Sequence, residues 1–168
     1  MKINRKIRII LIVCIVLMNI SCDQISKNIV RNTIDKNQRI EVFNDNLILT
    51  KVENTGAAYS IGSELPYTLK IILLQALPLL VLFFLLFKII KETEYSKETI
   101  IGITFIVGGG IGNIYDRIIY RSVTDFLIMD LGFIKTEVFN MADVSVMIGS
   151  FIIMTSVLLN RKGSFFKH

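Results

Sequence analysis

The stretch Phe139-Asn140-Met141-Ala142-Asp143 leads into an uncharged run, residues 144–160, that is rich in Val, Ile, Leu, Met and Phe. Such a run predicts a helix that spans a membrane. Asn140 and Asp143 are three residues apart, so a helix would place them on one face. An ionisable group at the edge of the hydrocarbon layer is costly. Asp143 is therefore either a functional carboxylate or a hydrated residue that caps the helix.

Three further runs, residues 9–22, 71–87 and 99–115, also carry no charged side chain. With 52% hydrophobic and 20% charged residues in a chain of 168, the composition indicates one integral-membrane domain. We predict spans at about residues 9–27, 68–88, 98–116 and 138–160. The first run is short, and its basic start together with Ile20-Ser21-Cys22 also resembles a lipoprotein signal. The three later spans favour a first membrane helix.

Two β-prone runs, residues 40–43 and 47–52, flank Asn44-Asp45-Asn46 and predict a hairpin outside the bilayer. A third β-prone run, residues 123–129, precedes a turn at Asp130-Leu131-Gly132. The predicted fold class is thus an all-α membrane protein with four transmembrane helices and a small extracytoplasmic β-hairpin or sheet. Within the spans, Pro78 predicts a bend, and Gly108 with Gly112 allows helices to approach closely.

Lys and Arg are concentrated at both chain ends and in the short segment 88–97. Because such residues mark the cytoplasmic side, we expect a multi-pass protein with both termini in the cytoplasm. The polar residues at the opposite ends of the spans then gather near the outer membrane face. They are Asp23, Asn54, Arg117, Asp125 and Asp143.

The side-chain inventory limits the chemistry of these groups. His168 is the one histidine, and Cys14 and Cys22 share an apolar run. This inventory excludes a zinc protease of the HExxH kind and a Ser–His pair, and it argues against a disulfide framework. No basic face is interleaved with aromatic residues, so no nucleic-acid partner is expected. A small proton-coupled transporter that uses Asp143 and Arg117, or a non-catalytic membrane scaffold, is the alternative to an enzyme.

Two carboxylates remain as the catalytic inventory. When close together they share a proton, so that one activates water and the other protonates a carbonyl, with no cofactor. Asp125 and Asp143 are the candidates, since they stand at the two ends of the last outer segment and the turn at 130–132 can bring them together. Asp116 is a third carboxylate, which the adjacent Arg117 could neutralise.

Five sequence blocks, in this order, resemble the lipoprotein signal peptidases (signal peptidase II). Tyr59 stands where that family usually has Phe. The resemblance covers nearly the whole chain. The blocks are residues 23–27 (DQISK), 54–59 (NTGAAY), 112–117 (GNIYDR), 123–126 (VTDF) and 139–143 (FNMAD).

The resemblance implies an aspartic endopeptidase of the bacterial cytoplasmic membrane, with its active site near the outer face and Asp125 and Asp143 as the catalytic pair. It would cut prolipoproteins just before a diacylglyceryl-modified cysteine, as a monomer without metal or cofactor, and be inhibited by globomycin. Gly108 and Gly112 would leave room for a signal-peptide helix. The residues expected to shape the site or hold the substrate are Asp23, Lys27, Asn54, Gly56, Asn113, Arg117 and Asn140.

Overall fold

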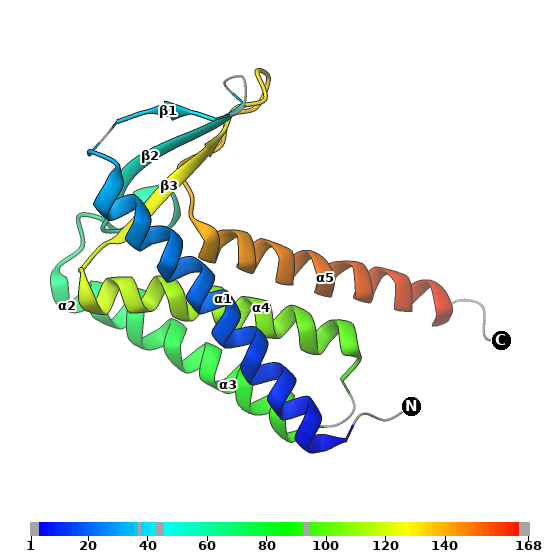
Figure 1. The fold of residues 1–168 in the computed structure, drawn as a ribbon. Coiled ribbons are helices and arrows are strands. Elements are labelled where there is room, and N and C mark those ends of the chain that lie inside the picture. The colour runs from blue at the N-terminus through cyan, green and yellow to red at the C-terminus, as the bar shows by residue number, and fades with distance from the viewer. Residues whose placement is uncertain (1–3, 37, 43–45, 93–94, 165–168) are drawn as a thin grey trace.

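The structure, a computed structural model, describes residues 4–36, 38–42, 46–92 and 95–164. This part of the chain forms a body of long helices with a small antiparallel sheet at one end (Figure 1). Helices suit a membrane because their backbone polar groups pair internally. The elements in chain order are α1 (Arg5–Thr33), β1 (Ile40–Glu41), β2 (Leu47–Asn54), the 3₁₀ turn η1 (Ala58–Ser60), α2 (Tyr67–Ile71), the π-helical η2 (Ile72–Ala76), α3 (Leu77–Lys91), α4 (Lys97–Ile119), β3 (Val123–Met129) and α5 (Met141–Ser164).

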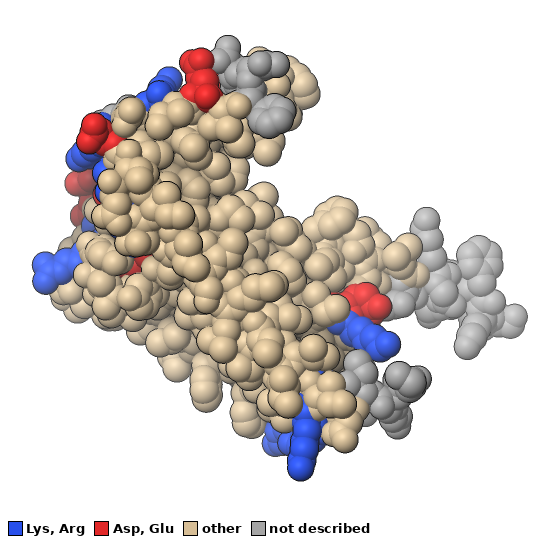
Figure 2. Space-filling model, viewed as in Figure 1, with Lys and Arg blue, Asp and Glu red and all other residues tan. Residues whose placement is uncertain are grey.

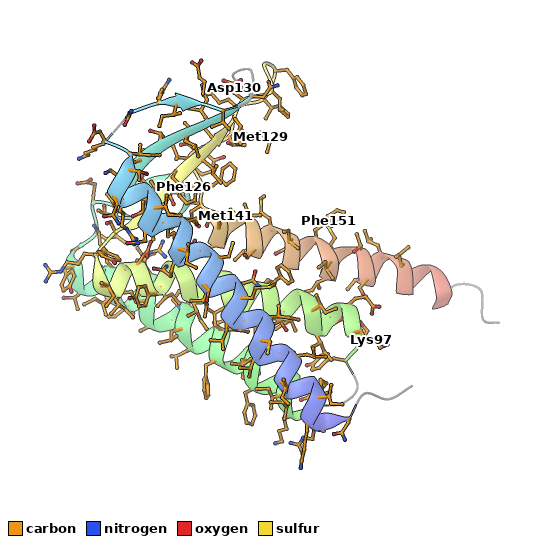
Figure 3. All side chains as sticks on the ribbon, viewed as in Figure 1. Lys97, Phe126, Met129, Asp130, Met141 and Phe151 are labelled. Atoms are coloured by element: carbon orange, nitrogen blue, oxygen red, sulfur yellow. The ribbon has the colours of Figure 1, made fainter. Side chains whose placement is uncertain are left out.

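Four helices of the described chain are long and apolar enough to cross a membrane: Arg5–Thr33, Tyr67–Lys91, Lys97–Ile119 and Met141–Leu159. They confirm the predicted fold class. In Figure 2 the charged side chains lie toward the two ends of the molecule, and uncharged surface covers the middle. Figure 3 places Lys97 at the end of the body remote from the sheet and Asp130 at the sheet, so α4 runs from one charged zone to the other.

Helix α4 is central, because it contacts α1, α3 and α5. Its glycines make these contacts close: a Cβ added at Gly108 would lie 2.7 Å from Cβ of Asn19 in α1, and one at Gly112 would lie 2.6 Å from Asp23 Oδ2. The predicted close approach of helices is confirmed. The expectation that these glycines leave room for another helix is wrong, because α1 already occupies that face.

The sheet has the order β1-β2-β3, with both pairs antiparallel. Pairing of Ile40 with Leu49 confirms the predicted hairpin, although residues 43–45 of its turn lie outside the described residues. The chain after β3 turns at Gly132, where φ is +79°, and returns along β3 through a bridge between Leu127 and Phe139. Phe126 on β3 and Met141 at the start of α5 pack where the sheet meets the helices (Figure 3).

The helix that contains Pro78 changes its hydrogen-bond pattern just before the proline. Residues Ile72–Ala76 form a π-helix, and the backbone N–H of Leu77 donates to Ile72 O. Proline lacks the N–H that would bond to the carbonyl four residues earlier, and a π-helical turn is one way to absorb that loss. The predicted distortion of the helix thus lies about one turn before Pro78, in the π-helix, whose residues Leu73 and Leu74 line an apolar groove.

Candidate active site

The sheet positions the first carboxylate. Asp125 on β3 lies opposite Val52 on β2, next to an irregularity in the register between Leu49 and Val52. Asn54 is two residues beyond Val52, so its side chain is the diagonal neighbour of Asp125 on the same face of the sheet. Accordingly, Asn54 Nδ2 donates to Asp125 Oδ2 at 3.1 Å.

Asp125 is only 5% exposed. Burial raises the pKa of Asp125 to about 6, against two hydrogen bonds, from Asn140 and Asn54, that lower it; the negative charge of Asp143 raises it further. Burial dominates because a carboxylate that loses its water is less stable than the neutral acid. The pKa of Asp125 therefore lies closer to neutral pH than that of an ordinary aspartate, which suits a group that donates and accepts protons.

The second carboxylate lies in the first turn of α5. The N–H of Asp143 donates to Asn140 Oδ1 at 3.1 Å, and the N–H of Asn140 donates to Asp143 Oδ2 at 3.0 Å. This reciprocal pair is a capping box, with Asp in place of the usual Glu. The helix begins at Met141 rather than near residue 138. Asn140 thus lies just before the helix and caps it: its side-chain oxygen accepts from an N–H of the first turn. The prediction that Asn140 and Asp143 share a face of the helix is therefore wrong.

Asn140 also joins the two carboxylates. Its Nδ2 donates to Asp125 Oδ1 at 2.6 Å, while its backbone N–H binds Asp143. Asn140 is fully buried, so a single residue fixes both acids. The two explanations offered for Asp143, cap and functional group, are therefore not exclusive.

A buried lysine supports Asp143 through one intermediate. Lys27 Nζ donates to Asn113 Oδ1 at 2.8 Å, and Asn113 Nδ2 donates to Asp143 Oδ1 at 2.9 Å. The positive charge of Lys27 thereby fixes which way the Asn113 amide points, with its NH₂ group toward the carboxylate. Lys27 and Asn113 come from α1 and α4, so three helices converge on this acid.

An ion network lies behind these residues. Lys27 Nζ pairs with Asp23 Oδ2 at 2.8 Å and with Asp116 Oδ2 at 3.1 Å, all with fully buried side chains. The predicted pairing of Asp23 with Lys27 is confirmed. Asp23 Oδ1 in turn accepts from the N–H of Ala142 at 2.9 Å, which ties α1 to the start of α5.

Asp116 belongs to this network and not to the acid pair. Besides Lys27 it pairs with Arg31 Nη2 at 2.9 Å. The suggestion that Arg117 neutralises Asp116 is wrong as to the direct partner, because adjacent helical residues point in different directions. The guanidinium of Arg117 instead donates to Gly56 O at 2.9 Å and to Asn113 O at 3.2 Å.

The loop that follows β2 is folded over the site. Asn54 Oδ1 accepts from the N–H of Gly56 at 2.9 Å, which makes the predicted turn. A Cβ on Gly56 would lie 2.6 Å from Ile61 O, so only glycine fits there. Tyr59 and Ser60 then adopt φ values of 56° and 54°. Arg117 thus holds this strained loop beside Asn113.

Two polar residues in the site were not singled out from the sequence. Gln24 Nε2 lies between Asp23 Oδ2 and Asp116 Oδ1, at 3.0 Å from each. Arg31 binds Asp116 and, through Nε, Thr124 Oγ1 at 2.8 Å. The spacing of Lys27 and Arg31 by four residues was a usable signal for the second. For Gln24 the sequence offered no signal other than its position in the block formed by residues 23–27.

An apolar groove of about 540 Å³ opens beside Asn113, the residue that donates to Asp143. Leu73, Leu77 and Pro78 form one wall, opposite Ile106 and Gly110 of α4. Asn113 and Arg117 line its polar end. An elongated, partly apolar molecule lying in this groove would therefore reach the residues that bind Asp143 and the loop at Gly56.

The arrangement suits general acid–base chemistry. One buried acid has a raised pKa, a second is held by helix N–H and amide donors, and their environments differ. No group of three or more His, Cys, Asp or Glu side chains within the described ranges could hold a metal ion. All nine candidate residues lie in this one connected set of contacts. They are Asp23, Lys27, Asn54, Gly56, Asn113, Arg117, Asp125, Asn140 and Asp143.

Comparison with known proteins adds the family. A family model described as "Signal peptidase (SPase) II" matches residues 14–159. A protein of Staphylococcus haemolyticus named lipoprotein signal peptidase is 34% identical over 158 residues, which covers 94% of this chain and 96% of the relative. One of Clostridium novyi with the same name is 32% identical over 152 residues, with coverage of 90% and 98%.

Two solved structures, each described as a bacterial membrane enzyme studied by the in meso method, share the fold. The first has a TM-score of 0.81 at 26% identity and covers 94% of this chain and 93% of its own. The second has a TM-score of 0.76 at 24% identity, with coverage of 88% and 92%, and supports the fold alone. With the family model matched over most of its length, the chain belongs to the signal peptidase II family.

Proposed function

We propose that this protein removes the signal peptide from diacylglyceryl-modified prolipoproteins by hydrolysing the amide bond just before the lipidated cysteine. Asp125 and Asp143 are the catalytic pair in this proposal. The observation that carries it is the bridge made by Asn140, which binds both carboxylates. Asn113, which donates to Asp143, also lines the apolar groove. The family match and the names of the relatives support the substrate class.

In this proposal Asp125 is the proton donor, because burial raises its pKa to about 6, closer to neutral pH than its ordinary value. Asp143, which accepts N–H donors from Asn113 and Asn140, is the base. It takes a proton from water as the water oxygen attacks the scissile carbonyl carbon, and Asp125 gives its proton to the carbonyl oxygen. When the C–N bond breaks, the amine leaves with the proton from Asp143, and Asp125 recovers its own as the carbonyl re-forms.

The groove accounts for the substrate's mixed chemistry. A signal peptide and a diacylglyceryl group are apolar, and burying them removes apolar surface from water. Arg117 and Asn113 at the polar end of the groove are placed to bind backbone carbonyls near the scissile bond. The Gly56 loop, held by Arg117, covers this end. Cyclic peptides of the globomycin type would occupy the same place as inhibitors.

Orientation follows from the same proposal. The sheet and the acids would lie at the outer face of the bacterial cytoplasmic membrane, with both termini in the cytoplasm, where basic residues concentrate at the other ends of the helices. The enzyme would act as a monomer without cofactor, since one chain supplies both acids and the groove. A transporter would need charged groups along the depth of the spans, whereas the ion network is confined to their sheet-side ends.

The test is processing of a lipidated prolipoprotein by the purified protein, followed as a gel shift. Asp125→Asn and Asp143→Asn should each abolish processing while the protein stays folded and inserted. Asp130→Asn, which changes a partly exposed carboxylate paired with Lys135, is the matched control and should process normally. Normal processing by either active-site variant would overturn the assignment, and efficient cleavage of an unlipidated substrate would overturn the substrate class.

A further inference from the structure

A second cavity, of about 230 Å³, is lined by residues from α2 and from the end of α4, the two elements at the left of Figure 1, and shares Arg117 with the groove. Three cationic side chains line it: Lys70, Arg117 and Arg121. Tyr67 and Gln75 add polar atoms, and none of the described lining residues is acidic. Three positive charges around one small cavity indicate an anionic ligand.

The cations differ in how free they are. Arg117 is held by the carbonyls of Asn113 and Gly56, so it contributes a fixed charge to the wall. Neither Lys70 nor Arg121 makes an ion pair with any described residue. The carboxylate of Glu53, close by, binds the hydroxyls of Ser122 and Thr124 instead. Lys70 and Arg121 therefore retain donors for a ligand.

Arg121 is held in an unusual backbone conformation. It directly follows the last turn of α4 with φ of 62°, a position that favours glycine or asparagine. The guanidinium lies over the ring of Tyr67 at 5.4 Å from the centroid. The strained backbone aims this side chain back over the start of α2, and observed strain of this kind is common where a residue serves a site.

The surroundings point to a lipid. Tyr67–Lys91 and Lys97–Ile119 are candidate spans, so Lys70 and Arg121 lie at the level where a bilayer presents its headgroups. Their apolar neighbours Leu69, Ile118 and Ile119 are 42%, 57% and 54% exposed and suit acyl chains. We propose that this cavity binds the phosphate of an anionic membrane phospholipid, with Lys70 and Arg121 as its donors.

Guanidinium and ammonium groups bind phosphate through charge-assisted hydrogen bonds, and basic pockets between membrane helices hold lipid headgroups. This proposal is independent of peptidase activity, because Lys70 and Arg121 make no contact with the acid pair or its partners in the hydrogen bonds given above. It is tested with the full-length protein in mild detergent. The midpoint of thermal unfolding is followed by circular dichroism as phosphatidylglycerol, phosphatidylcholine or inorganic phosphate is added.

Phosphatidylglycerol should raise the midpoint at a concentration on the order of tenfold lower for the wild type than for the double variant Lys70→Gln/Arg121→Gln. The matched control is Lys36→Gln/Arg39→Gln, which removes the same charge from exposed positions between α1 and β1 and should respond as the wild type does. An equal loss in both double variants, or none in the first, would overturn the proposal. Stabilisation by inorganic phosphate alone would overturn the lipid as its source.

Arg121→Gly separates binding from folding. Glycine accepts the positive φ without strain, so the lipid-free protein should unfold at a higher temperature than the wild type. Its response to phosphatidylglycerol should nevertheless fall. A variant that is more stable yet keeps the full lipid response would contradict a role for the guanidinium.

Discussion

Asn140 binds Asp125 and Asp143 at the same time: its side-chain amide donates to Asp125 Oδ1 at 2.6 Å, and its backbone N–H donates to Asp143 Oδ2 at 3.0 Å. One residue thus ends the segment that returns along β3, caps α5 and binds both members of the acid pair. Its side-chain oxygen is used as well, as the acceptor for the N–H of Asp143. Stability of α5 and geometry of the site are therefore coupled through Asn140, and substitutions can separate them.

Asn140→Ala should lose both roles, with a fall in processing rate of about 100-fold, the size of effect that a misplaced catalytic group produces. The missing cap should also cost about 1 kcal/mol of stability. Asn140→Ser is the matched variant, because serine caps a helix well but is too short to bind Asp125. It should recover the stability and not the rate, as measured by unfolding in detergent and by the gel-shift assay. Recovery of the rate by serine would contradict the bridge.

Asp125→Asn should make the protein more stable at alkaline pH. The folded-state pKa of Asp125 is about 6, above its ordinary value of 3.8, so the fold disfavours the ionised form. This penalty is absent below pH 3.8, grows between pH 3.8 and 6, and is complete above pH 6, where it amounts to at most about 3 kcal/mol. Asparagine is neutral throughout and escapes it.

Unfolding of Asp125→Asn and wild type in detergent, compared at pH 4 and pH 8, measures this effect. The variant should gain stability at pH 8 and show no gain at pH 4. Equal differences at both pH values would show that Asp125 is not held against its ionised form.

The sequence predicts contacts between residues that are close in the chain better than contacts between residues that are far apart in it. The pair Asp23–Lys27 follows from a spacing of four within one helix, and it was found at 2.8 Å. The contact of Asn54 with Asp125 joins residues 71 positions apart. It depends on the register of β2 and β3, which includes an irregularity that no local pattern announces. Arg31 shares a helix face with Lys27, but its partners Asp116 and Thr124 are remote from it in sequence, so these contacts were missed.

The pH dependence of processing should follow the protonation of Asp125, because the reaction needs the acid form of this group. Activity should fall as pH rises through the pKa of Asp125. Asn54→Ala removes a hydrogen bond that lowers this pKa, so the alkaline side of the profile should move to higher pH. Asn28→Ala, at an exposed asparagine on α1, should leave the midpoint unchanged. If the Asn54→Ala profile were lower in rate but not shifted in pH, Asn54 would have only a structural role at the end of β2.

Lys27→Gln should destabilise the protein strongly. It leaves the buried carboxylates of Asp23 and Asp116 without the cation that both contact, and removal of one partner from a buried ion pair costs about 3–5 kcal/mol. Lys88→Gln breaks the Lys88–Glu92 pair, whose side chains are about two-fifths exposed, and should have no measurable effect. Unfolding of both variants is measured in detergent. If Lys27→Gln were as stable as Lys88→Gln, Lys27 would not be the centre of a buried ion network.

Gly112→Ala tests whether close packing of α4 on α1 serves the site. A Cβ at position 112 would lie 2.6 Å from Asp23 Oδ2 and 3.5 Å from Cβ of Ala142. Asp23 is fixed by Lys27, Gln24 and the N–H of Ala142, so it cannot yield without shifting the start of α5 and with it Asp143. Processing should fall about 100-fold, as expected for a small displacement of a catalytic group.

Gly110→Ala is the matched control on the same helix. There a Cβ would meet Leu82 Cδ1, also at 2.6 Å, but this atom is the end of a side chain that can change rotamer beside the groove. Because Gly110 also lines the groove, Gly110→Ala should lose some processing rate, but less than Gly112→Ala, since apolar atoms move there and not the Asp23 carboxylate. Both rates come from the gel-shift assay, with helix content measured by circular dichroism to verify folding. Equal losses in the two variants would mean that glycine serves general helix packing, whereas a larger loss at position 112 ties the Asp23 carboxylate to the placement of Asp143.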